Sequence, residues 1–91
     1  MTIEESHNFI DKLKNGYRFI TRFQENEWGI NYTNPDFLKW SSENEMFTNS
    51  FGEMDCKQKY SENNMTEDEL VDFLVKNYSY DVMIKKLKPI N

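Results

Sequence analysis

His7 and Cys56 are the one histidine and the one cysteine of the chain, and they are its candidates for a base and a nucleophile. Nucleophilic catalysis needs these groups, and a third that orients the base, held together. Their spacing does not support this, because His7 follows the apolar period of a predicted helix and Cys56 lies in a predicted strand. We interpret His7 as a half-buried helix residue and Cys56 as a small apolar side chain. An enzyme that uses the pair is a minor alternative, which predicts that Cys56→Ser abolishes activity.

Other patterns that could support catalysis or ligand binding are equally weak. Sixteen Asp and Glu residues would allow an acid–base pair anywhere, so such a pair has no specificity here. Gly16, Gly29 and Gly52 stand singly, without the glycine-rich loop that binds phosphate. The segment 53–56 contains two acids but lacks the spacing of a calcium loop. The sequence predicts no enzyme, no cofactor and no metal site.

The charges are distributed unevenly along the chain. The formal net charge is −5, yet residues 25–72 contain twelve acids and three bases, a net of −9. Residues 1–24 contain three acids and four bases, and residues 73–91 contain one acid and four bases. An acidic middle segment therefore lies between two weakly basic ends.

One interpretation of the acidic segment is a solvated surface, typical of soluble proteins. A second is a face that docks on a basic partner, because complementary fields speed encounter and acids can occupy a site meant for phosphates. Exposed Trp and Tyr side chains, with Trp28 as a further candidate, would anchor such a contact. The predicted partner-binding residues are Glu43, Glu45, Glu53, Asp55, Glu62, Glu67, Asp68, Glu69, Asp72, Trp40 and Tyr60.

A third interpretation is that the basic ends contact nucleic-acid phosphates directly. The net charge of −5 argues against strong non-specific affinity, and the sequence contains no recognition helix or stacking motif. The alternative function is therefore that of a small regulatory protein that binds DNA or RNA. Its predicted contact residues are Lys76, Lys85, Lys86 and Lys88, joined by Arg18 and Arg22.

The composition describes one small domain over residues 1–91. Aromatic residues make up 15% of the chain, whereas disordered chains are poor in them. No apolar run approaches the roughly 20 residues of a membrane span, and the N-terminus is unlike a signal peptide. Alanine is absent and asparagine occurs eleven times, which suits an A+T-rich genome such as that of a low-GC bacterium or its phages. We expect a soluble protein of the bacterial cytosol, and no membrane partner.

Length, acidity, aromatic content and the lack of catalytic motifs together resemble the small phage-encoded inhibitors of bacterial defence, of the anti-CRISPR and DNA-mimic type. The resemblance covers the whole chain at the level of composition, so no residue role is carried over from it. It implies a protein that acts by stoichiometric binding, often by masking the nucleic-acid channel of a nuclease. The basic C-terminus departs from a pure DNA mimic.

Two helices are predicted by their N-terminal signals. The sequence T-x-x-E occurs at residues 2–5 and at residues 66–69, and this capping box marks a helix start. Helices are therefore expected over residues 3–15 and 67–77. Gly16 can adopt the left-handed conformation that ends the first of them.

The strands are predicted from alternating apolar residues. Residues 17–23 and 28–32 alternate, so they form a hairpin around the four-residue loop 24–27. The cap-like sequence Asn-Pro-Asp at residues 34–36 then predicts a short helix or helical turn near residues 37–40.

The remaining segments are less regular. Residues 46–51 and 54–60 are expected to be two further strands around Gly52, and residues 61–64 a loop. From residue 80 the spacing fits either a helix or a strand. We favour a helix that Pro89 ends, because lysines are well placed near a helix C-terminus.

These elements predict a single α+β domain. An N-terminal helix is followed by a small antiparallel sheet of three or four strands, and C-terminal helices pack on one face of the sheet. The predicted core consists of Ile10, Leu13, Phe19, Phe23, Ile30, Tyr32, Leu70, Phe73, Leu74, Ile84 and Leu87.

Overall fold

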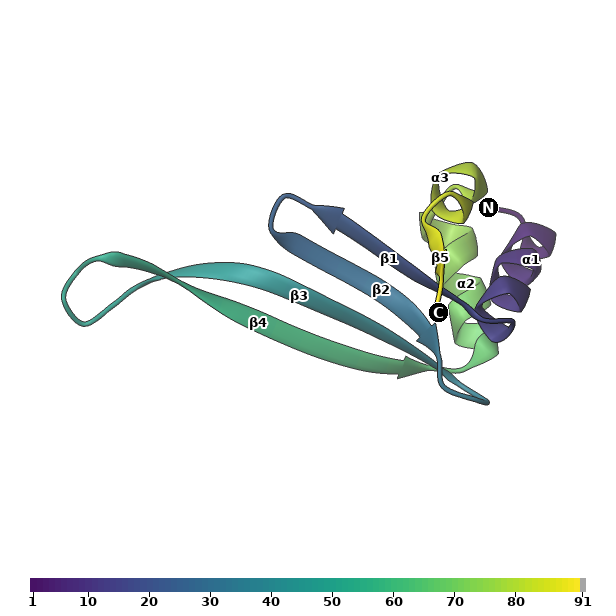
Figure 1. Ribbon diagram of the computed structural model, residues 1–91, viewed down its shortest axis with the longest axis horizontal. Helices are drawn as coiled ribbons and strands as arrows, with labels where there is room; N and C mark the ends of the chain where they lie inside the picture. The colour runs from purple at the N-terminus through teal and green to yellow at the C-terminus, as the bar shows by residue number, and fades with distance from the viewer. Residues whose placement is uncertain (91) are drawn as a thin grey trace.

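Helices cover one end of an antiparallel sheet in the computed structural model, which describes residues 1–90 (Figure 1). The sheet has five strands in the order β4-β3-β2-β1-β5, rather than the three or four that the sequence predicts. The α+β class, the N-terminal helix and the presence of C-terminal helices are confirmed. The helices are α1 (Ile3–Lys14), α2 (Glu67–Asn77) and α3 (Tyr80–Ile84), and the strands are β1 (Tyr17–Phe23), β2 (Asn26–Tyr32), β3 (Phe37–Thr48), β4 (Met54–Met65) and β5 (Leu87–Pro89).

Both predicted capping boxes are formed. The Thr2 side chain accepts a hydrogen bond from the Glu5 backbone N–H at 3.0 Å, and the Glu5 carboxylate accepts one from the Thr2 N–H at 2.8 Å. Thr66 and Glu69 make the same reciprocal pair at the start of α2. These bonds satisfy N–H groups that the first helical turn leaves without partners, so the helix starts follow directly from the sequence.

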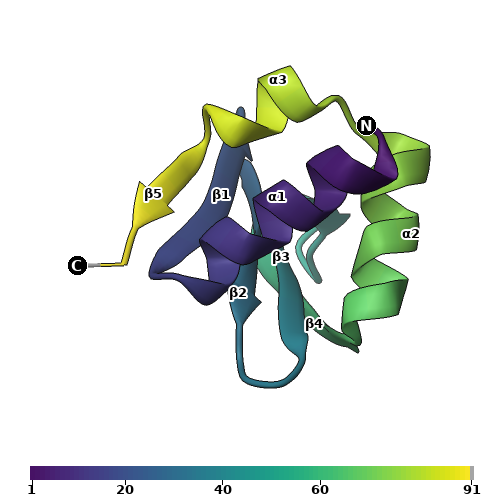
Figure 2. The same ribbon diagram turned by 90° about the vertical axis from the view of Figure 1, so that its right-hand side faces the viewer.

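The hydrophobic core lies between the helices and one face of the sheet, which we call the inner face. Strand alternation and register place Phe19, Ile30, Phe37 and Met65 on this face. Figure 2 shows α1 crossing β1 and β2, with α2 beside it. No helix within residues 1–90 lies on the opposite, outer face of the sheet (Figure 1). The helices contribute Phe9, Ile10 and Leu13 from α1, Leu70 and Leu74 from α2, and Met83 from α3.

The predicted core is partly wrong. Phe23 is 75% exposed, because it ends β1 beyond the part of the sheet that the helices cover. Four other predicted residues are only half-buried around the core: Tyr32, Phe73, Ile84 and Leu87. The prediction lacked Phe9, Phe37, Met65 and Met83, which are buried.

The predicted helical turn at residues 37–40 and the predicted loop at residues 61–64 are both wrong. These segments belong to β3 and β4, which pair continuously from Phe37 opposite Met65 to Thr48 opposite Met54. Pairing with β2 and β4 buries Phe37 fully, and this gain comes from residues distant in sequence. The local helix signal is outweighed because this segment pairs with a strand on each side.

Two further boundaries differ from the prediction. The β1–β2 hairpin turns over two residues rather than four, since Phe23 already pairs with Asn26 and Gln24 adopts a positive φ of 56°. The predicted C-terminal helix ends at Ile84. The chain then forms β5, which pairs with the start of β1 and places Leu87 opposite Phe19.

Gly29 makes room for a tryptophan on the outer face. A Cβ atom at this position would lie 2.5 Å from the Phe19 carbonyl oxygen and 2.8 Å from the Trp40 ring. The indole of Trp40, on the neighbouring strand, therefore lies against the bare backbone of β2. This contact half-buries a large ring on a face that no helix covers.

We expect Gly29→Ala to destabilise the fold by about 1–3 kcal/mol, because the added methyl group overpacks against backbone and ring atoms. Urea unfolding of the two proteins measures the difference. Asn64→Ala, at an exposed position of the outer face, is the matched control and should change stability by less than about 0.5 kcal/mol. Equal stability of Gly29→Ala and the natural protein would contradict the close packing.

Candidate functional site

The outer halves of β3 and β4 project from the domain as a two-stranded ribbon (Figure 1). Pairing between β2 and β3 ends at Glu27 opposite Ser42, so from Glu43 onward β3 pairs only with β4. We call residues 43–59 the ribbon. It gives the molecule its long axis of 53 Å, against 26 and 25 Å for the other two. Neither of its faces is covered by a helix of the described residues (Figure 1).

The tip of the ribbon is an ordered turn. The Asn49 N–H donates to the Glu53 carbonyl at 2.9 Å, and the Asn49 side-chain oxygen accepts from the N–H groups of Phe51 and Glu53. Gly52 has a φ of 78°, which suits glycine at the last position of a three-residue hairpin loop. The turn therefore fixes the backbone of Phe51, which is 86% exposed.

Large apolar side chains on the ribbon are exposed to solvent. Met46 and Met54 are 60% and 65% exposed, and Phe47 lies on the other face under the Lys57 ammonium, 5.7 Å from its ring centre. Isolated exposed apolar residues are common, whereas larger exposed apolar patches are typical of interaction sites. The sequence pattern predicted strands here, but it did not indicate that these side chains are exposed.

The ribbon carries four of the predicted partner-binding acids. Glu43 lies opposite Lys59 and Glu45 opposite Lys57, so each of these acids has a base across the ladder. Glu53 and Asp55 lie nearer the tip, where Asp55 faces Phe47. The negative charge of the ribbon is therefore concentrated toward its tip.

The four acids of α2 have largely structural roles. Glu67 forms an ion pair with Lys14 of α1, and this hydrogen bond raises the pKa of the Lys14 ammonium above its usual value. Glu69 caps its own helix, and Asp72 pairs with Lys76 at 3.0 Å. Asp68 is exposed in the first turn. The predicted acidic residues are thus divided between the ribbon, α2 and Glu62 on the outer face.

Trp40 and Tyr60 come together on the outer face at the base of the ribbon. Their rings are nearly parallel, at 17°, with centroids 6.4 Å apart. Tyr60 is 56% exposed, and the neighbouring Glu62 carboxylate raises the pKa of its phenol. Trp28 lies on the inner face instead, where its ring packs on Phe19 with the centroids 4.9 Å apart.

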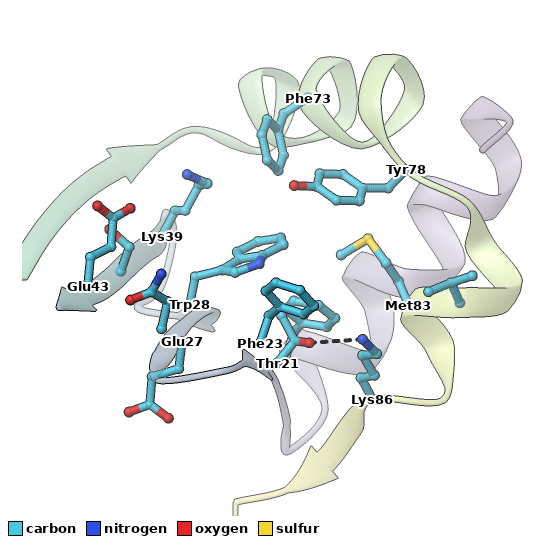
Figure 3. Close-up of a pocket in the computed structure, with 14 residues that line it drawn as sticks. Thr21, Phe23, Glu27, Trp28, Lys39, Glu43, Phe73, Tyr78, Met83 and Lys86 are labelled. Carbon is cyan, nitrogen blue, oxygen red and sulfur yellow. Dashed lines mark hydrogen bonds between the residues drawn. The ribbon is translucent and has the colours of Figure 1, made fainter. Parts of the chain in front are cut away.

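A groove of about 410 Å³ lies on the inner face where the helices end (Figure 3). The rings of Trp28, Phe73 and Tyr78 contact one another on its floor, and Lys39 lies over the first two. Phe23 and Val82, both exposed, line the groove. The sequence analysis missed it, because its walls come from three strands and the C-terminal helices.

The predicted basic residues are also divided among several places. Lys88 of β5 lies opposite Arg18 of β1 in the ladder, and Arg22 is on the same outer face. Lys76 is paired with Asp72 on α2. The Lys86 ammonium lies on the inner face, where it donates to the Thr21 hydroxyl at 2.9 Å (Figure 3). Lys85 is exposed at the end of α3.

The structure does not bring His7 and Cys56 together. His7 lies on α1 and Cys56 on the ribbon, at opposite ends of the molecule (Figure 1). Both are exposed, so the expectation of a half-buried His7 is wrong, and Cys56 is a small side chain open to solvent. Within residues 1–90, no three His, Cys, Asp or Glu side chains cluster as metal ligands would. None of the helices described is long and apolar enough to cross a membrane.

No protein-family model matches this chain, and no curated protein or solved structure compared with it does. The function therefore has to be argued from the ribbon, the groove and the outer face.

Glu62→Gln is expected to lower the pKa of Tyr60 toward the ordinary tyrosine value, because the variant removes the carboxylate that repels a phenolate. Residue-resolved NMR titration of the tyrosine rings measures this shift. Tyr78 is an internal control, since its raised pKa comes from burial and should not change. An unchanged Tyr60 titration would contradict the effect of Glu62 on the phenol.

Proposed function

We propose that the protein is a non-enzymatic binding protein that docks the ribbon on a basic, nucleic-acid-binding surface of a nuclease or other nucleic-acid-handling protein. In this proposal it is an inhibitor of the phage-encoded type, which works by stoichiometric occupation of that surface. No chemistry is required of its side chains.

The observation that carries this proposal is the position of the exposed apolar side chains. Residues 1–90 expose nine large ones, and four of these lie on the ribbon. Exposed apolar surface on a projecting element is typical of protein–protein contact sites. The four residues are Met46, Phe47, Phe51 and Met54.

The charge of the ribbon supports a basic partner. Glu53 and Asp55 lie near an exposed apolar tip, so an apolar anchor is surrounded by negative charge. Six residues of each strand project beyond β2, which corresponds to a reach of about 20 Å at ~3.3 Å per residue. A ribbon of this length can enter a channel that a globular face cannot.

Direct nucleic-acid binding remains a second candidate, supported by one observation. Arg18 and Lys88 face each other across β1 and β5, and like charges directly opposite are unfavourable unless an anion lies between or near them. Arg22 adds a third cation on the same face, and the stacked Trp40 and Tyr60 rings lie farther along it. This candidate uses the outer face rather than the ribbon.

Shortening the ribbon tests the first proposal without disturbing the core. Glu43 and Lys59 pair directly, so replacing residues 44–58 by Asn-Gly connects them with a two-residue turn. We expect this variant to fold and to lose partner affinity by roughly 100-fold or more, since the anchors are removed. A tagged protein captures the partner from a low-GC bacterial lysate, and the purified pair is then measured by calorimetry at low and high salt.

The control carries Arg18→Glu and Lys88→Glu with the ribbon intact. It should bind the protein partner as the natural chain does, and competitor DNA should displace that partner. Full affinity of the shortened variant would overturn the proposal. Loss of binding in the Arg18/Lys88 variant, with nucleic acid in the captured fraction, would favour the second candidate.

A further inference from the structure

The open edge of β4 carries a charge pattern that is complementary to itself. β4 is the last strand of the sheet, and no strand of residues 1–90 pairs with its free side. A long open edge is a template for another strand, and proteins usually block it with charged side chains. Here the charges follow the order acid, acid, base, base: Glu53, Asp55, Lys57 and Lys59. All four have the same parity, so their side chains share the inner face.

The hydrogen bonds show which backbone groups face the open edge. The Cys56 N–H donates to the carboxylate of its own neighbour Asp55 at 2.8 Å. On β3, the N–H of Asn44, which lies opposite Gln58, donates to the Asn26 side chain on the side away from β4. Both observations fit one alternation, in which Met54, Cys56 and Gln58 turn their N–H and C=O groups outward.

From this geometry we infer that the β4 edge binds a second copy of the chain, antiparallel, with the twofold axis at Cys56. Each copy then contributes residues 53–59. Asp55 lies beside Lys57 of the second copy and Glu53 beside its Lys59, and symmetry repeats both pairs. Four opposite-charge pairs form, and no like charges meet across the new interface.

Neighbouring registers lack this match. An axis one residue earlier places Asp55 against Asp55 of the second copy, and an axis one residue later places Lys57 against Lys57. Like charges directly opposite in an antiparallel pair are destabilising. The charges that would repel a strand in another register therefore select this one.

The dimer also extends the exposed surface of the ribbon. Met46 lies opposite Cys56 on the outer face. In the dimer, the Met46 and Cys56 side chains of the two copies therefore form one row across the outer face. Only the edge of β4 becomes covered, while both faces of the ribbon stay open. The inference does not depend on the proposed partner, because it concerns the purified protein alone.

Reciprocal charge variants test the pairing and its register. Asp55→Lys sets two bases against each other at each of the two 55–57 pairs, and Lys57→Asp sets two acids against each other there. Each variant alone is expected to dimerise roughly tenfold or more weakly than the natural chain, since two pairs become repulsive. An equal mixture should recover dimers, because the lysine introduced at position 55 of one chain meets the aspartate introduced at position 57 of the other. Sedimentation equilibrium at low and high salt measures all three samples.

Two controls make the result decisive. Glu62→Lys changes the net charge as Asp55→Lys does, but it lies on β4 outside the paired segment and should leave dimerisation unchanged. A short bis-maleimide should cross-link the natural chain through Cys56, and Cys56→Ser should abolish the product. A monomer at every concentration, dimers insensitive to positions 55 and 57, or a mixture that stays monomeric would each overturn the inference.

Discussion

The pairing of β3 with β4 is the interaction on which the rest of the structure depends. The ladder runs over twelve residue pairs, but helices cover only its first part. At the covered end it supplies Phe37 and Met65 to the core and leads directly into the cap of α2. At the other end it continues past β2, where no helix within residues 1–90 covers its faces. The same ladder thus completes the covered part of the sheet and continues into the projecting ribbon.

A free two-stranded ribbon is marginal in water, so the stability of this one has to come from local contacts. Cross-strand charge pairs, the Lys57–Phe47 contact and the Asn49 turn supply them. At its base, Asn44 bonds to the β1–β2 hairpin through Asn26 and Glu25. The exposed side chains of Met46, Phe51 and Met54 have no such stabilising contact, and the proposed contact with another molecule would account for their exposure.

The parts of the fold that depend on neighbouring residues could be predicted from the sequence. Capping boxes fixed the starts of α1 and α2, and alternation identified β1 and β2. The first part of β3 was missed because Asn-Pro-Asp before Phe37 is also a helix-start signal, whereas the pairing of Phe37 with Met65 is remote. β5 was missed for a related reason, since lysines around Leu87 resemble a helix end while its partner is β1.

The candidate site was less predictable than the fold. The sequence indicated acids and surplus aromatics, but it could not show which acids α2 uses for its own cap and for Lys14. It also could not show that Phe23 and Phe51 are exposed, because an apolar residue in an alternating pattern looks the same in a core and on a free ribbon. Exposure depends on how far the helices reach along the sheet, which is a property of the whole fold.

The most direct test of the account is residue-resolved amide hydrogen exchange, first on the protein alone and then with its captured partner. Alone, the ladder amides of the ribbon should exchange faster than those of the covered sheet but more slowly than an unfolded chain, because the ribbon is paired yet opens locally. With the partner bound, protection should increase mainly in residues 43–59. Increased protection confined to the helices or to the Arg18–Lys88 edge, with the ribbon unchanged, would contradict the ribbon as the binding element.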